Sequence, residues 1–466
     1  MPSARTPAPS EPLEPRRLLA ASPLLIEGTE GADVIRVRQT GSAVWVARNG
    51  SLRVHAARDV SSIVVEARGG DDLFIADPSV KLHVTVYGGD GDDHLRGGPN
   101  RDRLHGEAGA DRVYGGAGND QLYGGEGTDT VSGGDGDDVL VTLGGDADRL
   151  AGNGGRDNFW ADAGGTDPAT ADALADLAAG DVRHAVPSFM SYRIRQSGST
   201  YRTVPVPTEL AGQELDDPVA AASVTRWADV SDGPLFASGG PSEHDIDQNL
   251  AEDCYFMAGL SSIAKLAPEV ITDNVVELGD GTYGVHFRRE DQDVFLRVDG
   301  DMPASGSGAL AYAGLGEERS AWVPVIEKAF AFFRESQGTY VSINWGKMSE
   351  AYDALGLPSL GRIFSTTGFD RDGGLLEGIA MRLARGDSML YSTLDVQPQG
   401  SRLRPDHILM IDRVIRNDAG QAVSVVLRDP HKNDGAVVAD GVNDGYITIT
   451  AAEAAAWMEA VSWCRL

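Results

Sequence analysis

One cysteine, a glutamine upstream of it and two polar residues far downstream are of the types needed for nucleophilic acyl transfer. Cys254 opens an apolar, helix-like run, where the free N–H groups of a first helical turn stabilise a thiolate. Gln248 stands six residues earlier and offers an amide donor to an oxyanion. His407 is the candidate general acid and base, and Asp429 the residue that orients its imidazole. A cysteine on an apolar run is more often a small core residue, so this assignment needs support from the flanking sequence.

The other histidines and the second cysteine are weaker candidates. His244 lies in a polar stretch, which is typical of a solvated residue. His431 follows Asp429 by two positions and competes with His407 for the role of base. Cys464 is expected in the core, on a terminal helix-like segment. No His, Cys and Asp residues have zinc-like spacing, so we expect no transition metal.

A second set of residues with metal-binding chemistry recurs with a period of nine. Each aspartate is followed two positions later by an apolar residue, as in Asp120 and Leu122, and glycines fill the turns between. Carboxylates and backbone carbonyls are hard oxygen ligands that suit Ca²⁺. Without the ion such closely spaced aspartates repel one another, so the energy of binding becomes energy of folding. The predicted Ca²⁺ ligands are Asp93, Asp102, Asp111, Asp120, Asp129, Asp138, Asp148 and Asp157.

This period predicts a solenoid in which each nonapeptide forms a glycine-rich turn and a short strand with its apolar residue inward. The pattern resembles the RTX (hemolysin-type) repeat over about 87–160, which implies a calcium-binding parallel β-roll. A flexible Gly/Asp-rich linker has no reason to keep an apolar residue in register over eight turns. Weaker copies precede the repeats at 28–35 and 69–73. Segments expected to be strands of the same solenoid without ion ligands are 44–47, 63–66 and 83–87.

The sequence around Cys254 closely resembles the catalytic segment of calpain-type cysteine proteases, of the papain-like clan. The motifs that carry this resemblance are Gln248-x₅-Cys254, Val298-Asp-Gly-Asp-Met-Pro303, Ala321-Trp-Val-Pro-Val-Ile-Glu-Lys-Ala-Phe330, Asp406-His407-Ile-Leu-Met-Ile411 and Leu427-Arg-Asp429-Pro430. The resemblance covers roughly 233–466. It implies an α+β papain-like fold, a Cys254–His407–Asp429 triad and Gln248 as oxyanion donor.

Three positions depart from the family pattern. Asp429 stands where the family has asparagine, and its carboxylate can still accept a hydrogen bond from the imidazole. His431 replaces the tryptophan that shields that pair, which is expected to expose the pair to water and puts full proteolytic efficiency in doubt. Asp406 replaces the glycine before the histidine and places a charge beside it.

Composition and length bound the remaining possibilities. At 466 residues the chain is expected to be multidomain, and its net charge of −30 argues against nucleic acid as a partner. Two cysteines are too few for a disulfide scaffold. No stretch approaches the roughly 20 apolar residues that span a bilayer. The expected parts are a disordered leader over 1–22 with an LEPR-type export motif (Leu13-Glu-Pro-Arg-Arg-Leu-Leu19), a β-roll over 23–162, a linker or pro-segment over 163–232 with a short helix near 171–177, and the catalytic domain over 233–466.

These features predict a calcium-binding cysteine endopeptidase that cleaves protein substrates outside the cell or at the cell surface, to which the chain could be attached. Nothing in the sequence indicates an oligomeric state. Two alternatives stay open. The first is a calcium-stiffened surface or adhesion protein with an inactive protease-like domain, in which Cys254 and Cys464 could form a disulfide. The second is a transglutaminase-type acyltransferase, which uses the same triad chemistry with calcium.

Overall fold

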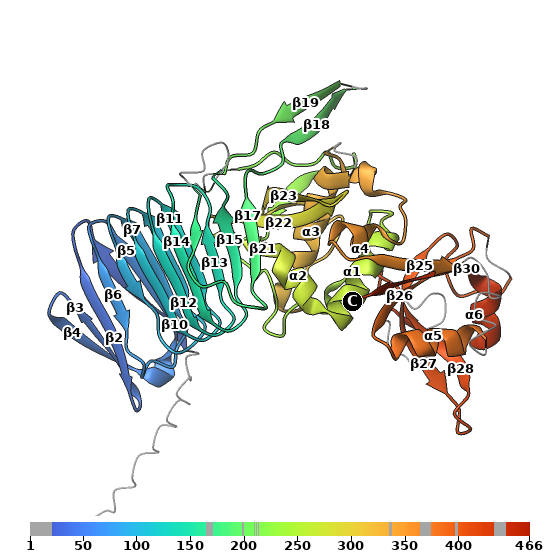
Figure 1. Ribbon diagram of the computed structural model, residues 1–466, viewed down its shortest axis with the longest axis horizontal. Helices are drawn as coiled ribbons and strands as arrows, with labels where there is room; N and C mark the ends of the chain where they lie inside the picture. The colour runs from blue at the N-terminus through green and yellow to red at the C-terminus, as the bar shows by residue number, and fades with distance from the viewer. Residues whose placement is uncertain are drawn as a thin grey trace, which may run out of the picture. The chain divides into compact units, whose positions relative to one another are not determined.

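A computed structural model describes residues 21–164, 171–197, 200–208, 210, 212, 214–334, 338–363, 374–396, 399–432 and 444–466. The predicted leader lies, up to residue 20, outside this described part. The chain divides into two compact units (Figure 1). The first comprises Met1–Leu140, Asp148–Asp157 and Ala173–Asp181; the second comprises Val141–Ala147, Asn158–Asp172 and Val182–Leu466.

The N-terminal repeats form a parallel β-roll, as the period of nine predicts. Alternate nonapeptides contribute their strands to alternate sheets, so neighbours in one sheet are 18 residues apart, as in Leu104↔Leu122 and Val113↔Val131. These apolar residues are completely buried between the sheets. The first sheet has the order β1 (Ser22–Thr29), β5 (Val60–Arg68), β7 (Val84–Asp90), β9 (Arg103–Ala108), β11 (Gln121–Glu126), β13 (Val139–Thr142), β15 (Asn158–Asp162) and β17 (Val182–Val186).

The second sheet of the roll runs beside the first and ends in an antiparallel extension. Its order is β16 (Ala173–Leu174), β14 (Arg149–Gly154), β12 (Thr130–Asp135), β10 (Arg112–Ala117), β8 (His94–Arg96), β6 (Leu73–Ala76), β2 (Val34–Thr40), β3 (Ala43–Arg48) and β4 (Ser51–Ala56). The segment 44–47 therefore lies in an antiparallel meander, because β3 and β4 pair antiparallel. Its expected place among the parallel coils was wrong. The short turns at Gly41 and Gly50, both with positive φ, allow the chain to reverse there.

The segment predicted as a linker, 163–232, contains several strands in its described parts. The helix predicted near 171–177 is absent, and β16 occupies that position. The amide of Ala173 donates to Asp148 O and that of Ala175 to Leu150 O, so the open edge of β14 pairs with this segment and overrides its helical propensity. Further along, β17 belongs to the roll sheet, while β18 (Tyr192–Ser197) and β19 (Thr200–Val204) form a hairpin.

The second compact unit has pairings that begin before residue 233, where the catalytic domain was expected to start. Strand β20 (Arg226–Asp229) pairs antiparallel with β24 (Asp301–Ala304), and Val219 forms a bridge with Thr339. The second compact unit likewise includes everything from Val182 onward. The Ala-, Thr- and Pro-rich composition of this segment hides these pairings, because they depend on partners far away in the sequence.

The second unit combines helices with antiparallel sheets. A three-stranded sheet consists of β21 (Val275–Glu277), β22 (Thr282–Arg289) and β23 (Gln292–Asp299). A six-stranded sheet has the order β25 (Ser359–Ile363), β30 (Met458–Arg465), β26 (Asp387–Thr393), β27 (Ile408–Arg416), β28 (Ala422–Arg428) and β29 (Tyr446–Thr450). The helices are α1 (Cys254–Leu266), α2 (Pro268–Asn274), α3 (Trp322–Phe333), α4 (Glu350–Ala354), α5 (Leu375–Leu383) and α6 (Ala451–Trp457).

Successive side chains on the strands of the six-stranded sheet point to opposite faces, and each face packs against different helices. Met389 and Leu427 belong to an apolar core that also contains Ile379 of α5 and Trp457 of α6. The residues next to them point the other way, toward α1: Ser388 Oγ lies 2.5 Å from Ser262 Oγ. Helix α1 is therefore held against β26 and β27. Strand β30 also corrects the helix-like reading of the C-terminal segment that carries Cys464.

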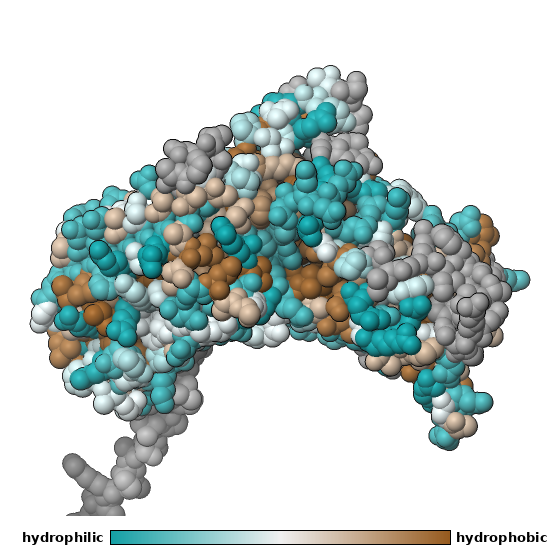
Figure 2. Space-filling model, viewed as in Figure 1, coloured by the Kyte–Doolittle hydropathy of each residue, from teal (hydrophilic) through white to brown (hydrophobic). Residues whose placement is uncertain are grey.

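The visible face in Figure 2 is mainly hydrophilic, with apolar patches that include one at the N-terminal end of the roll. There the edge strand β4 exposes Leu52 and Val54. In the part of the chain that the structure describes, no helix is both long enough and apolar enough to cross a membrane.

Candidate active site and calcium ladder

Cys254 is the first residue of α1, as predicted from the apolar run that follows it. The carbonyl of Asp253 accepts hydrogen bonds from Phe256 N (2.8 Å) and Met257 N (3.1 Å), which starts the helix. Burial raises the pKa of the Cys254 thiol to about 12, although a hydrogen bond from the backbone of Ile408 opposes the shift. That bond places the sulfur beside the residue that follows His407. The thiol therefore needs a proton acceptor to become a nucleophile at neutral pH.

The antiparallel pairing of β27 with β28 brings His407 and Asp429 together. His407 immediately precedes β27 and Asp429 immediately follows β28, and Met410 pairs with Arg428. His407 Nε2 lies 3.0 Å from Asp429 Oδ1, and both side chains are buried. Arg428 fixes this end of β28 by donating to Ser261 Oγ (3.1 Å), which lies on α1. The strand pairing thus brings the imidazole of His407 and the carboxylate of Asp429 within hydrogen-bonding distance.

The loop that carries His407 is held by a buried hydroxyl. Thr393 Oγ1 accepts from His407 N at 2.8 Å and donates to Arg404 O at 2.8 Å. Asp406 has φ +48°, which favours glycine and which aspartate tolerates better than most residues. This conformation gives a physical reason for a glycine at that position in the family pattern.

Asp429 forms hydrogen bonds with His431 as well as with His407. Its Oδ1 also lies 3.1 Å from His431 Nδ1 and accepts from His431 N at 2.9 Å. Burial acts to raise the pKa of Asp429, but the hydrogen bonds from His407 and His431 outweigh it and hold the pKa well below its usual range. Asp429 is therefore a carboxylate throughout the physiological pH range, shared by two imidazoles. The contact of His431 with the pair was not foreseen.

Gln248 lies in the site, and its amide is already engaged. Gln248 Nε2 donates to Ala251 O (2.6 Å) and to Asp253 Oδ1 (2.8 Å). The Gln248 backbone N–H donates to Pro430 O (2.8 Å), which ties this segment to the Asp429 loop. For the side chain to stabilise an oxyanion, one of its two hydrogen bonds has to be exchanged for the substrate.

Two buried carboxyl groups next to the cysteine were missed by the sequence analysis. Asp253 Oδ2 and Glu327 Oε1 are buried oxygens with no donor among the described residues, and the two side chains hydrogen-bond to each other when one is protonated. Burial raises the pKa of Asp253 to about 7 and that of Glu327 well above its usual value. The pair therefore retains a proton near neutral pH. No spacing signal exists for this pair, because 74 residues separate its members.

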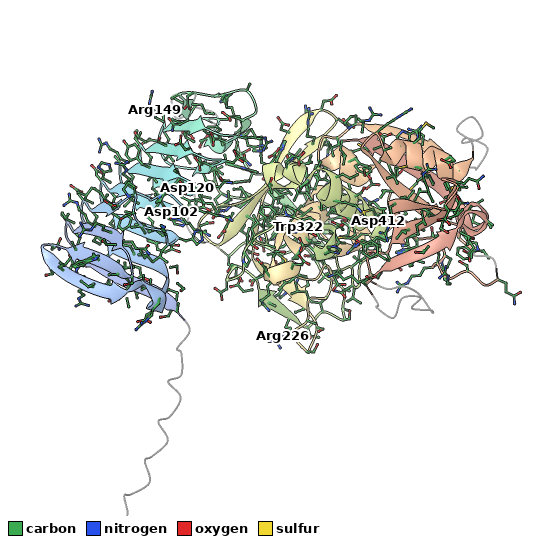
Figure 3. The ribbon with its side chains drawn as sticks, turned by 90° about the horizontal axis from the view of Figure 1, so that it is seen from below. Asp102, Asp120, Arg149, Arg226, Trp322 and Asp412 are labelled. Carbon is green, nitrogen blue, oxygen red and sulfur yellow. The ribbon has the colours of Figure 1, made fainter. Side chains whose placement is uncertain are left out.

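The repeat aspartates form a hydrogen-bonded ladder in two rows inside the roll. Each Oδ1 except that of Asp102, which accepts from Val84 N, accepts from the backbone N–H of the aspartate one coil earlier. Examples are Asp102 N to Asp120 Oδ1 (2.7 Å; both residues are labelled in Figure 3) and Asp120 N to Asp138 Oδ1 (2.8 Å). All eight predicted aspartates are buried. Two more rungs come from the weaker copies, since Asp33 N donates to Asp72 Oδ1 (2.6 Å) and Asp72 N to Asp93 Oδ1 (2.7 Å). Both of these aspartates were missing from the predicted ligands.

The second carboxylate oxygen of the ladder fits a cation. Within the described residues, the buried Oδ2 atoms of Asp93, Asp111, Asp120, Asp138 and Asp157 accept no hydrogen bond. Burial, with neighbouring carboxylates, raises the pKa of Asp120 to about 8 and that of Asp111 to about 7. A row of buried, unpaired oxygens of like charge is the environment that a hard divalent ion stabilises. Ca²⁺ is the ion that these repeats bind.

The chain's two cysteines are free thiols. Cys254 is partly exposed and Cys464 is buried, with its Sγ 3.0 Å from Pro358 O. The disulfide of the alternative hypothesis is therefore not formed in this structure.

Two protein-family models match parts of the chain. Residues 207–420 match the model of the calpain family of cysteine proteases, and 87–122 and 105–140 match the RTX calcium-binding nonapeptide repeat (4 copies). The first match includes Cys254 and His407 and ends before Asp429.

Three curated plant proteins are similar to part of the chain. The calpain-type cysteine protease ADL1 of Oryza sativa subsp. japonica is 25% identical over 150 residues, which is 32% of this chain and 7% of that protein. The calpain-type cysteine proteases DEK1 of Zea mays and of Arabidopsis thaliana are 24% identical over 150 residues and 26% over 121 residues, which is 32% and 25% of this chain and 7% and 5% of those proteins. The alignments thus span less than a tenth of these relatives. The chain carries a calpain-family cysteine protease domain preceded by RTX calcium-binding repeats.

Proposed function

We propose that this protein is a calcium-dependent cysteine endopeptidase with a Cys254–His407–Asp429 triad in a papain-like fold. The observation that carries the proposal is the buried contact between His407 Nε2 and Asp429 Oδ1, 3.0 Å long, beside the helix that begins at Cys254. The Asp429 carboxylate holds the imidazole in place and stabilises the imidazolium that forms. The protease domain implies protein substrates.

In the proposed mechanism, His407 takes the proton of the Cys254 thiol and the sulfur attacks the peptide carbonyl. The oxyanion is stabilised by the Cys254 backbone N–H and, after its hydrogen bond is exchanged, by Gln248. The C–N bond breaks as His407 gives its proton to the leaving amine, which leaves a thioester on Cys254. Water, deprotonated by His407, then hydrolyses the thioester and regenerates the thiol. Loss of one oxyanion donor costs about 2.7–4 kcal/mol in a comparable acyl-transfer site.

The proposal extends to location. Folding that depends on bound calcium suits an environment rich in calcium, and RTX repeats are typical of secreted bacterial proteins. We therefore infer that the chain works outside the cell or at the cell surface, with Ca²⁺ required for the roll to fold.

A thiol-directed probe tests the assignment of the nucleophile. The full chain in millimolar calcium is treated with a peptide bearing an electrophilic carbon, and the labelled cysteine is mapped by mass spectrometry. We expect rapid labelling of Cys254, slowed in His407→Ala, and none of the buried Cys464. Labelling of Cys254 at the same rate in wild type and His407→Ala would contradict the proposed activation.

A second candidate is a calcium-bound protein whose protease-like domain is silent. The engaged Gln248 amide favours it, because in this structure both of its N–H groups bond to protein acceptors. A folded, calcium-saturated sample that neither reacts with the probe nor cleaves any protein would support this candidate.

A further inference from the structure

A histidine outside the proposed triad completes a cluster of three metal-ligating side chains. His407, Asp429 and His431 each offer one ligand atom, and these atoms lie within 4.8 Å of one another. Both imidazoles contact the same oxygen, Asp429 Oδ1, from 3.0 Å and 3.1 Å. His407 and Asp429 are buried, and His431 is mostly so.

The turn that follows β28 brings His431 to the proposed triad. Asp429 O accepts from Lys432 N (3.0 Å), which closes a turn with Pro430 and His431 at its centre. The two rings accordingly lie 5.2 Å apart with an interplanar angle of 50°. The backbone N–H of His431 donates to Asp429 Oδ1, which anchors His431 at this place. The cluster thus rests on the turn after β28 as well as on side-chain contacts.

The donor set and its size suit a transition metal. Two imidazole nitrogens and a carboxylate oxygen bind zinc with bonds of about 2.0–2.2 Å, which puts tetrahedral ligand atoms roughly 3.3 Å apart. The contacts of 3.0 Å and 3.1 Å at Asp429 Oδ1 are close to that separation. Three protein ligands leave a fourth position for water, as in open zinc sites. The site is chemically distinct from the oxygen-only ladder of the roll, which suits calcium.

We propose that His407, Asp429 and His431 form a zinc-binding site that reversibly silences the cysteine peptidase. The silencing rests on the proposed function, whereas the binding of zinc does not. Nε2 of His407 otherwise donates its proton to Asp429, and a metal bound to Nε2 displaces that proton. The neutral ring then carries its remaining proton on Nδ1 and has no free lone pair to accept the proton of the thiol. The thiol of Cys254 then has no acceptor and stays protonated. His431, which stands where calpains have tryptophan, is the residue that gives this chain the site.

Metal binding is measured directly on the full chain in millimolar calcium, which saturates the roll. Zinc affinity is obtained by competition with a chromophoric chelator, and Co²⁺ is used as a second probe for its visible absorption in tetrahedral sites. The variants are His431→Asn, which retains a polar donor without the imidazole lone pair, and His244→Asn, a control at a half-exposed histidine outside the cluster. Circular dichroism establishes that each variant is folded.

We expect one zinc site in the wild type and in His244→Asn. In His431→Asn its affinity should fall by at least about 10–100-fold, the range that loss of even an outer-shell partner costs. The Co²⁺ absorption should disappear with it. Equal zinc affinity in His431→Asn and wild type would overturn the proposal.

Peptidase assays in the same buffer test the silencing, with each variant compared with its own zinc-free rate. Saturating zinc should lower the wild-type rate by about 10² or more, the usual contribution of general acid–base catalysis, and a zinc-selective chelator should restore it. His431→Asn should keep its own rate at that zinc concentration. Equal inhibition of both would place the metal elsewhere and refute the site. Zinc binding without peptidase activity in any sample would refute the proposed function and leave the site standing.

Discussion

At the scale of single residues, the site is defined by where its protons reside. The Cys254 thiol has a pKa raised to about 12 by burial, whereas hydrogen bonds keep Asp429 a carboxylate. Between these extremes, Asp253 and Glu327 share a proton directly beside the nucleophile. In the proposed mechanism, His407 accepts the proton of the thiol.

The pair of Asp253 and Glu327 predicts a particular dependence of stability on pH. Their pKa values are raised in the folded protein, so the native state keeps protons that the unfolded chain has lost, and the free energy of unfolding falls as pH rises from about 4 toward 7. Each retained proton contributes about 1.4 kcal/mol per pH unit. Glu327→Gln supplies the hydrogen-bond donor permanently and should flatten this slope.

Denaturant unfolding at pH 5, 6 and 7 in saturating calcium checks this prediction. The roll aspartates also titrate, but they are the same in both proteins, so the difference between wild type and Glu327→Gln isolates the pair. A variant whose stability follows the wild-type slope would show that the pair does not hold a proton.

Thr393 supplies a second prediction at this scale. Thr393→Val preserves the shape of the side chain and leaves His407 N and Arg404 O without their partner, at a cost of about 1–3 kcal/mol for each buried group left unsatisfied. We expect a lower melting temperature and a lower kcat. Thr393→Ser keeps the hydroxyl and should stay near wild type; if both variants behave alike, the hydroxyl does not position His407.

At the scale of elements, the sequence predicts what repeats and misses what depends on distant partners. The period of nine predicts the roll, its buried apolar residues and its aspartate ligands, because every coil repeats the same pattern of residues. The segment of β16 was predicted to be a helix, because its extended conformation depends on pairing with the open edge of β14. The approach of His431 to His407 was missed as well, because it depends on the pairing of β27 with β28 and on the turn that follows β28.

The coils of the roll predict which glycines cannot be replaced. Gly125 has φ +111°, and a Cβ there would lie 1.9 Å from Glu107 O in the next coil. Gly50 also has positive φ, at +80°, but a Cβ there would meet no atom within 4 Å. Gly50→Ala should cost about 1–3 kcal/mol from backbone strain alone, and Gly125→Ala should cost clearly more. Calcium-induced folding followed by far-UV circular dichroism compares them; equal losses would mean that the coils can move apart.

At the scale of the whole molecule, we expect calcium to offset the repulsion between carboxylates and so allow this acidic chain to fold. The net charge is −30, and within the described residues the buried Oδ2 atoms of Asp93, Asp111, Asp120, Asp138 and Asp157 accept no hydrogen bond. Asp120→Ala removes one rung and should raise the calcium concentration needed for folding, because affinity depends on the number of charged ligands. The exposed Asp90, outside the ladder, provides the control Asp90→Ala. A calorimetric calcium titration in which both variants match the wild type would exclude the ladder as the site.

The central claim is that Cys254 and His407 cleave peptide bonds in a calcium-folded chain. The most direct measurement is hydrolysis of an unstructured protein substrate by the full chain in millimolar calcium and in excess calcium chelator, beside Cys254→Ala and His407→Ala. We predict cleavage by the wild type in calcium, a loss of activity in both variants with their circular dichroism unchanged, and a loss of activity in the chelator. Cleavage that survives Cys254→Ala would contradict the account.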